Sequence, residues 1–359
     1  MKKFSIRFLQ ITLVIFLMSL VLHLVFYPSL SVTPWTWGSD LLQFKRQQVV
    51  ESQEKFNCLI IGSSRVYRQV NPALLDSLID SPLNTYNMGV NWLFAPESFY
   101  VMDQLVSTDS VPLKCVIIEL SKIRSIDYSN LHTARTKYWY NFSNFVFTLR
   151  AVASSNFAFH ERIATILAHT VSYVDQLINL GYLTEAFHFR TATKNSIETP
   201  EEIGNNGYLP LSVSNAVTVE ENVNDRHRKF LQDTSVVTRR YTTSVNQFRK
   251  FEENPDLLNR YNRVYAEALN DRISQAKLKG IHLVFLLTPR IDHNQYNELI
   301  PLFNTIHPEH RIEISDGRKY PQLYFAGYSF DETHLNTAGA DLFTTLLAEK
   351  LKPILNKSN

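Results

Sequence analysis

Three residues from two distant parts of this chain of 359 residues have the chemistry of a serine nucleophile, its general base and the carboxylate that orients the base. Ser64 follows Gly62 and Ser63 directly after an apolar run, and Asp331 precedes His334 by three positions near the C-terminus. A serine hydroxyl attacks a carbonyl when a base accepts its proton, and that base needs a partner that orients its imidazole. We therefore predict that Ser64 is a nucleophile, His334 its general base and Asp331 the group that orients His334.

The negative charge that develops during such an attack needs hydrogen-bond donors where it forms. Gly89 ends a second apolar segment, and a residue without Cβ lets the backbone approach a substrate closely. We predict that the N–H groups of Ser64 and Gly89 form an oxyanion hole, with Asn91 as a further candidate. Weaker candidates for substrate binding are Arg65, Asn87 and Ser121.

Each of these residues also has an ordinary structural interpretation. A Gly-Ser-Ser sequence after a strand is often a turn followed by a helix N-cap, and Asp331 fits a cap at the start of a helix. His334 alone fits a buried or surface histidine, and Asn87 to Gly89 fits the end of a strand. The catalytic interpretation depends on the conjunction, because every part falls where a predicted strand ends or a helix begins.

The segments that must position these residues alternate between apolar runs and amphipathic patterns. Short apolar runs predict buried strands at 56–62, 83–89, 114–120 and 281–289, and a weaker one at 310–315. Helical patterns predict helices at 72–79, 95–107, 159–180, 223–231, 255–280 and 337–351. Such alternation is typical of an α/β domain with a mainly parallel sheet, in which ligands bind beyond the carboxyl ends of the strands.

The chain divides into four parts by pattern. Residues 1–30 predict a short cytoplasmic tip and a membrane anchor, and residues 31–55 predict a linker or short helix. Residues 56–355 form the predicted α/β domain. Within it, residues 122–254 break the alternation and predict a large, partly helical insertion.

The anchor is predicted from a run of twenty residues without formal charge, Phe8 to Tyr27. About 20 apolar residues cross a hydrocarbon core of about 30 Å. Lys2, Lys3 and Arg7 precede the run, so the positive-inside rule places the N-terminus in the cytoplasm. A cleaved signal peptide is the alternative, but no A-x-A cleavage pattern follows. We predict a single-pass protein of a bacterial cytoplasmic membrane, with its domain outside, in the periplasm.

Charge and composition exclude several classes of protein. The chain has 36 basic and 34 acidic residues, which argues against a nucleic-acid binder, since such a protein needs a basic face. Two cysteines cannot form a disulfide framework or a zinc cluster, and the histidines show no metal-ligand spacing. We therefore expect neither a metal nor an organic cofactor.

The sequences G-S-S-R, N-x-G and D-x-x-H, in this order, resemble the blocks of the SGNH/GDSL hydrolase superfamily. In that family the first block is G-D-S, and Ser64 takes the place of its nucleophile. Gly89 matches the oxyanion glycine of the family, and Asp331 and His334 match its C-terminal pair. The resemblance implies a three-layer α/β/α fold of the flavodoxin-like type.

An N-terminal anchor with a G-S-S block looks like the extracytoplasmic branch of this superfamily, which includes proteins of alginate O-acetylation and of teichoic acid D-alanylation. The resemblance implies an acyltransferase or esterase that acts on acyl esters, chiefly acetyl, of an extracytoplasmic polysaccharide. It also implies a carbohydrate polymer or acyl-carrying glycan as substrate and a membrane-bound O-acyltransferase as partner.

Two departures from the family pattern keep a second interpretation open. The family's G-x-N-D block, whose Asn completes the oxyanion hole, has no match where Glu119 and Ser121 end the third strand. Loss of one oxyanion donor costs about 10²–10³ in rate. Arg65 replaces a hydrophobic residue and fits either an anion-binding group or an exposed arginine at the start of a helix. The alternative is a catalytically inactive glycan-binding or scaffolding component of a cell-envelope complex.

Overall fold

The computed structural model describes residues 2–30, 40–51, 56–80, 82–108, 111–123, 131, 139–178, 200–214 and 221–356. The chain forms two compact units. The anchor unit comprises Met1–Gln43, Ser125–Ala153 and Phe157–Ser196. The sheet unit comprises Phe44–Arg124, Ser154–Asn156 and Ile197–Asn359, and it contains every predicted site residue.

The described part of the sheet unit contains one sheet of five strands, and every pairing in it is parallel. The strands are β1 (Cys58–Ile61), β2 (Thr85–Asn87), β3 (Cys115–Glu119), β4 (His282–Leu287) and β5 (Arg311–Glu313). Each lies inside one of the predicted apolar runs. Their order is β2-β1-β3-β4-β5, which is the order of a flavodoxin-like doubly wound sheet.

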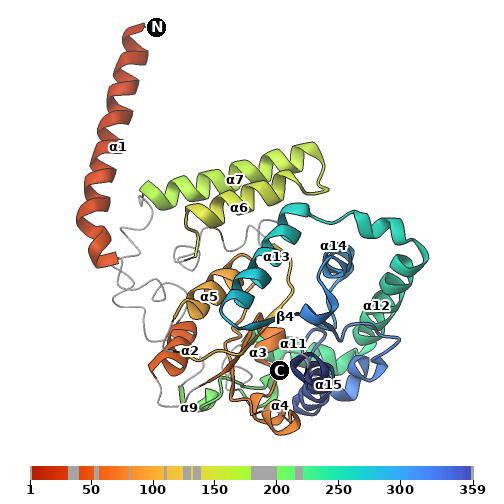
Figure 1. Ribbon diagram of the computed structural model, residues 1–359. Coiled ribbons are helices and arrows are strands. Elements are labelled where there is room, and N and C mark those ends of the chain that lie inside the picture. Colours follow the sequence, from red (N-terminus) through yellow and green to blue (C-terminus); the bar gives the residue numbers. More distant parts are fainter. Residues whose placement is uncertain are drawn as a thin grey trace. The chain divides into compact units, whose positions relative to one another are not determined.

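Helices cover both faces of this sheet (Figure 1). On one face, α4 (Pro72–Leu78) and α15 (Thr337–Asn356) pack over alternate strand residues such as Ile60 and Ile117. On the other face lie α5 (Glu97–Val106) and α13 (Arg263–Leu278). Successive side chains of a strand point to opposite faces of the sheet, so helices are needed on both faces to bury them. The predicted α/β architecture with a parallel sheet is confirmed.

The remaining elements of the sheet unit are mostly short. They are α3 (Ser64–Tyr67), α9 (Pro200–Ile203), η4 (Leu211–Val213), α11 (Glu221–Gln232), α12 (Ser235–Glu253), η5 (Pro255–Asn259), α14 (His293–Asn304), η6 (Pro308–His310), η7 (Pro321–Tyr324) and η8 (Ala326–Tyr328). One helix over 255–280 was the wrong prediction. Asn262 caps a new helix there, since its side chain accepts the N–H of Tyr265 at 3.1 Å.

The predicted linker contains a helix that packs into the sheet unit. Within 31–55 the structure describes α2 (Asp40–Glu51), which runs across the boundary of the two units. Its Lys45 is fully buried in the sheet unit and donates to the carbonyls of Asn87, Gly89 and Gly207. The rest of that linker lies outside the described residues.

The predicted insertion is divided between the units. Its helices α6 (Phe142–Ala153) and α7 (Phe159–Ile178) belong to the anchor unit. By contrast, α11 and α12 belong to the sheet unit, where Phe230 and Val237 join the core beneath the sheet. Helices α11 and α12 therefore complete the core of the sheet unit, although the sequence around them lacks the strand–helix alternation of the rest of the domain.

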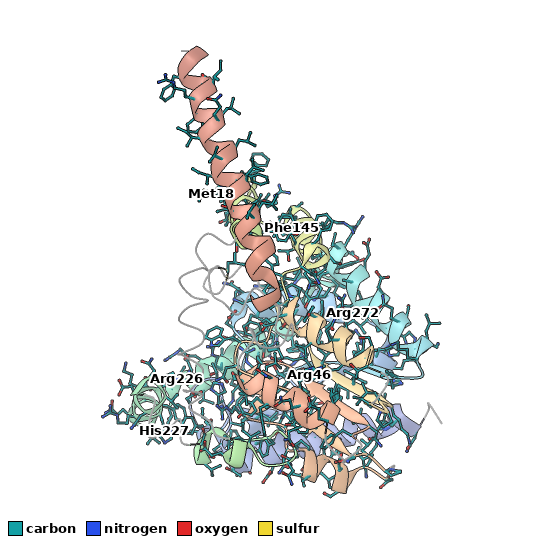
Figure 2. The ribbon with its side chains drawn as sticks, turned by 90° about the vertical axis from the view of Figure 1, so that its left-hand side faces the viewer. Met18, Arg46, Phe145, Arg226, His227 and Arg272 are labelled. Carbon is teal, nitrogen blue, oxygen red and sulfur yellow. The ribbon has the colours of Figure 1, made fainter. Side chains whose placement is uncertain are left out.

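The anchor unit begins with α1 (Lys2–Leu30), a helix of 29 residues. Its segment Phe4–Val21 has a mean hydropathy of 2.1 and is long and apolar enough to cross a membrane. The side chains of this segment are exposed, with Ser19 as the buried exception (Figure 2). An N-terminal apolar helix is thus present as predicted, and it packs against α7.

Glu298 on α14 gives the sheet unit a testable pH dependence. Burial raises the pKa of Glu298 to about 7, against the opposing effects of Lys122 and a backbone hydrogen bond from Ile123. Because the unfolded chain ionises this group near 4.5, the free energy of unfolding should fall as pH rises from about 4.5 to about 7. Glu298→Gln should remove up to about 3 kcal/mol of this decline, measured by urea unfolding at about pH 5 and about pH 8.

The matched control is Glu253→Gln, whose side chain is exposed in the wild type. That variant should follow the pH dependence of the wild type. Parallel curves for wild type and Glu298→Gln would show that Glu298 ionises equally in both states.

Candidate active site

A tight turn after β1 presents Ser64. Ser63 caps α3, because its Oγ accepts the N–H of Arg65 at 3.3 Å, and its own N–H donates to Glu119 Oε2 at 2.6 Å. A Cβ at Gly62 would lie 2.6 Å from the Cβ of Glu119, so only glycine fits this position. The turn therefore places Ser64 at the start of α3 and at the carboxyl edge of the sheet.

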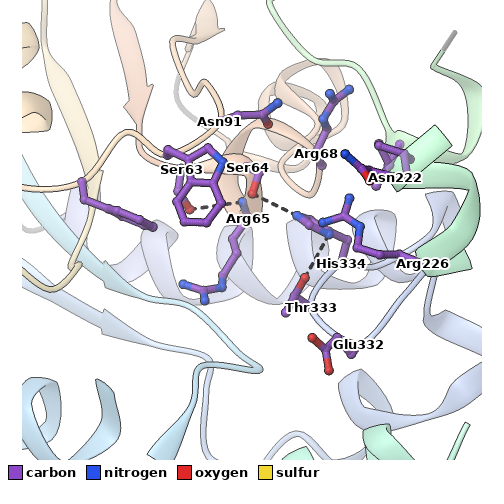
Figure 3. A pocket seen from close by; sticks show the side chains of 14 residues that line it. Ser63, Ser64, Arg65, Arg68, Asn91, Asn222, Arg226, Glu332, Thr333 and His334 are labelled. Carbon is purple, nitrogen blue, oxygen red and sulfur yellow. Dashed lines mark hydrogen bonds between the residues drawn. The ribbon is translucent and has the colours of Figure 1, made fainter. Parts of the chain in front are cut away.

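The three predicted catalytic residues lie together in one hydrogen-bonded row, of which Figure 3 shows Ser64 and His334. The Oγ of Ser64 lies 2.9 Å from Nε2 of His334. On the other side of the ring, Nδ1 of His334 lies 3.0 Å from both carboxylate oxygens of Asp331. Because an ionised carboxylate only accepts, Nδ1 carries the hydrogen and Nε2 is free to accept the serine proton.

Asp331 is held as a carboxylate by its surroundings. Its Oδ1 accepts the backbone N–H groups of Thr333 at 2.8 Å and His334 at 2.7 Å, and the Thr333 hydroxyl at 3.1 Å. Burial alone would raise the pKa of Asp331, but His334 and the two N–H groups outweigh it and hold that pKa well below its usual range. Asp331 therefore stays charged at neutral pH and can stabilise a protonated His334.

Arg290 fixes the loop that carries this pair. Its side chain is fully buried and sits just after β4, with a left-handed φ of 61°. Its Nε donates to Leu323 O at 2.8 Å, and its Nη1 donates to the carbonyls of Asp331 at 3.4 Å and His334 at 3.3 Å. Burial lowers the pKa of Arg290 to about 10, so it remains a cation at neutral pH. The sequence offered one signal for this residue, its place at the end of a predicted strand.

The two predicted N–H donors of the oxyanion hole differ in whether they already have an acceptor. Within the described residues the N–H of Ser64 has no acceptor, and it belongs to the same residue as the predicted nucleophilic Oγ. The N–H of Gly89 instead donates to Asn87 Oδ1 at 2.9 Å, so it is not available for the predicted role. Gly89 is required by close packing, since a Cβ there would lie 2.7 Å from the backbone nitrogen of Tyr67. Asn91 does line the pocket next to Ser64.

Two of the three predicted substrate-binding residues are structural. Asn87 is fully buried, and its Nδ2 donates to the carbonyls of Val66 at 3.0 Å and Val70 at 2.9 Å. The Oγ of Ser121 accepts the N–H of Ala95 at 3.0 Å and is likewise buried. Neither side chain lines the pocket, because each is consumed in joining neighbouring elements.

Arg65 lines the pocket but is held by its neighbours. Its guanidinium lies 3.5 Å from Glu119 Oε1 and 3.3 Å from Gln295 Oε1, and 14% of its side chain is exposed. Glu119 also accepts the N–H of Ser63 and the hydroxyl of Thr288. The carboxylate that ends β3 therefore ties Arg65 to the nucleophile turn.

No protein-family model, no curated protein and no solved structure matches this chain.

Ser64 and His334 line a cavity of about 400 Å³ (Figure 3). Sequence reasoning missed most of its wall, which includes Arg68, Trp92, Phe94, Leu211, Asn222, Val223, Arg226 and Glu332. The lining includes three arginines, of which Arg65 lies near Glu119 and Arg226 near Asp331, and Trp92 is 56% exposed. Such a lining suits a polar ligand with an anionic or oxygen-rich group.

Helix α11 supplies one side of the cavity with Asn222, Val223 and Arg226. His227 holds this helix against the loop that carries Asp331 and His334, because its ring stacks on Phe330 at 4.3 Å and its Nδ1 donates to Phe330 O at 2.7 Å. Arg226 also approaches Asp331, at 3.8 Å between Nη2 and Oδ2. A site assembled from the sheet edge is thus completed by a helix that the sequence placed in an insertion.

The arrangement of the site is chemically suited to nucleophilic attack by a serine. Among the described residues, no group of three or more His, Cys, Asp or Glu side chains is placed to hold a metal ion. The row of Ser64, His334 and Asp331 has the hydrogen-bond distances required of a nucleophile, its base and an orienting carboxylate.

Proposed function

We propose that this protein is a membrane-anchored, SGNH-like serine acyltransferase or esterase that acts on acyl esters, chiefly acetyl, of an extracytoplasmic polysaccharide. The observation that carries the proposal is the row from Ser64 Oγ through both nitrogens of His334 to Asp331. The strand order, the turn after β1 and the loop before α15 support the SGNH-like assignment.

In the first half-reaction, Ser64 Oγ attacks the ester carbonyl carbon while Nε2 of His334 accepts the hydroxyl proton. The tetrahedral oxyanion accepts the N–H of Ser64, and Asn91 at the pocket wall is the second candidate donor. The protonated His334 then donates to the departing alkoxide oxygen, which leaves an acyl group on Ser64. Asp331 stabilises the imidazolium throughout.

In the second half-reaction, an acceptor hydroxyl attacks the acyl-Ser64 carbonyl and His334 accepts its proton. The bond between the carbonyl carbon and Ser64 Oγ then breaks, and His334 returns the proton to Oγ, which restores the free serine. Water as acceptor gives hydrolysis, and a sugar hydroxyl gives transfer. Trp92 offers an exposed aromatic face for a sugar ring, and the arginines of the cavity suit an anionic polymer.

The same proposal includes the location of the reaction. Helix α1 would span a bacterial cytoplasmic membrane through Phe4–Val21, with the N-terminus inside. The sheet unit would then face the periplasm, where envelope polysaccharides are modified. A membrane-bound O-acyltransferase is the partner that would supply the acyl group.

Covalent trapping tests this function on the full-length chain in detergent. A fluorophosphonate reacts with an activated serine, so we expect one adduct, located by mass spectrometry on the peptide that contains Ser64. An acetyl ester added beforehand should slow the labelling, and His334→Ala should abolish it. A wild-type protein that neither takes the label nor cleaves a chromogenic acetyl ester would instead support an inactive glycan-binding or scaffolding component.

A further inference from the structure

Helix α7 carries an exposed apolar face in the anchor unit. The α7 stripe consists of Phe159, Ile163, Leu167, Val171 and Val174, which recur every three or four residues and therefore lie on one side of the helix. Their exposed fractions range from 43% to 72%. Between Ile163 and Val174 the helix contains no Asp, Glu, Lys or Arg.

The opposite side of α7 is buried and polar. Thr165, His169 and Ser172 are each less than 5% exposed. His169 Nδ1 lies 2.8 Å from the hydroxyl of Tyr140, and Ser172 Oγ donates to Leu131 O at 2.8 Å. A helix on the surface of a water-soluble protein has the reverse pattern, with its apolar side inward.

Helix α6 has a mixed interior. Asn144 and Thr148 are buried in it together with Ala151 and Val152, and Phe142 is 67% exposed. The polar interior and the apolar exterior of α7 indicate that the solvent around α7 is apolar. This observation is independent of the catalytic row, which lies in the sheet unit.

The membrane is the apolar solvent that the anchor unit offers. Helix α1 packs against α7, and its segment Phe4–Val21 is the candidate span among the described residues. Helix α7 itself has Glu161 and Arg162 at its start and a polar side along its length, so it is suited to lie in an interface and not to cross a bilayer.

We propose that the α7 stripe lies in the lipid interface of the membrane that α1 spans, among the headgroups and the upper acyl chains. This inference rests on the anchoring by α1 proposed above. At 1.5 Å per residue, the 20 residues of α7 would cover about 30 Å of membrane surface. The anchor unit would then be held by one spanning helix and one interfacial helix, which together fix its orientation on the bilayer.

Depth-dependent quenching tests the proposal with the full-length chain in vesicles of phosphatidylcholine and phosphatidylglycerol. An environment-sensitive fluorophore on Leu167→Cys should emit at shorter wavelength than in water. A nitroxide near the headgroup should quench it more than a nitroxide near the end of the acyl chain, because an interfacial helix lies about 5–10 Å into the boundary. Cys58 and Cys115 are fully buried, so the label reports the new cysteine.

Two further positions make every outcome decisive. Leu278→Cys replaces an exposed leucine of the sheet unit and should emit as in water, without quenching. Leu13→Cys lies in the middle of the candidate span and should be quenched more by the deep nitroxide. All three replaced side chains are exposed, so folding should be unaffected, which a thermal unfolding curve checks.

If Leu13→Cys is quenched and Leu167→Cys emits as in water, the stripe proposal is overturned while the anchoring by α1 stands. If Leu167→Cys shifts to shorter wavelength but neither nitroxide quenches it, a protein surface covers the stripe and the proposal is also overturned. Without quenching at Leu13→Cys, the anchoring itself is wrong.

Discussion

Ser64→Ala is expected to lower the turnover of an acetyl ester by about 10⁴-fold or more, with KM little changed. The reason is that the variant keeps the cavity, His334 and Asp331 but lacks the atom that forms the acyl-enzyme. The Oγ that is lost has its hydrogen bond to His334 Nε2 at 2.9 Å and is not part of the core. Initial rates with a chromogenic acetyl ester, measured on the full-length chain in detergent, give this result directly.

The matched control is Ser77→Ala, which removes an exposed hydroxyl that donates to Leu74 O on α4. This variant should retain turnover within about two-fold, since surface substitutions seldom matter. Both variants should unfold at the same denaturant concentration as the wild type. A Ser64→Ala protein that kept more than about a tenth of the turnover would rule out Ser64 as nucleophile.

The sheet and the catalytic row were predictable because their signals are local. Continuous apolar runs indicate buried parallel strands, and residues that directly follow such strands share one edge whatever the loops between them do. Ser64 after β1 satisfies this rule. Asp331 and His334 lie in the loop before α15, and D-x-x-H lets a carboxylate face the ring three residues on.

The same rule failed for the finer assignments at that edge. Asn87 ends β2, and Gly89 and Ser121 follow their strands as Ser64 does. In the structure, the side chains of Asn87 and Ser121 bond to neighbouring backbone groups, and the N–H of Gly89 donates to Asn87 Oδ1. Residue type and strand end identify the edge and leave the direction of each group open. That direction is set by partners in other segments, such as the carbonyl of Val66 for Asn87 and the N–H of Ala95 for Ser121, which no single segment encodes.

Other features depend on contacts between distant segments. Lys45 finds its three carbonyl acceptors on residues that follow it by 42 to 162 positions. The cavity wall on α11 belongs to a segment without strand–helix alternation, so its place beside the loop of Asp331 could not be read from periodicity. The sequence therefore could not predict that Lys45 is buried, because its three carbonyl acceptors come together only in the folded chain.

Arg290→Met is expected to cost about 2–4 kcal/mol of unfolding free energy, because it leaves buried carbonyls without their donor while relieving the burial of one charge. The guanidinium joins Leu323 O, Ser329 Oγ and the carbonyls of the catalytic loop at once, as only a planar fork of donors can. Methionine, like arginine, is unbranched at Cβ, so the left-handed φ of 61° is as demanding for it as for arginine.

Turnover should fall further than this loss of stability explains. Arg290 donates to the carbonyls of both Asp331 and His334, so without it the imidazole is free to move relative to Ser64 Oγ. A displacement of about 1 Å costs about 10²-fold in rate, and we expect that loss in kcat for the folded variant.

The control Arg228→Met removes an exposed ion pair with Asp225 on α11. It should change stability by at most about 1 kcal/mol and leave kcat unchanged. Urea unfolding and ester kinetics on the same samples separate the two effects: a folded Arg290→Met protein with wild-type kcat would mean that Arg290 stabilises the fold without positioning His334.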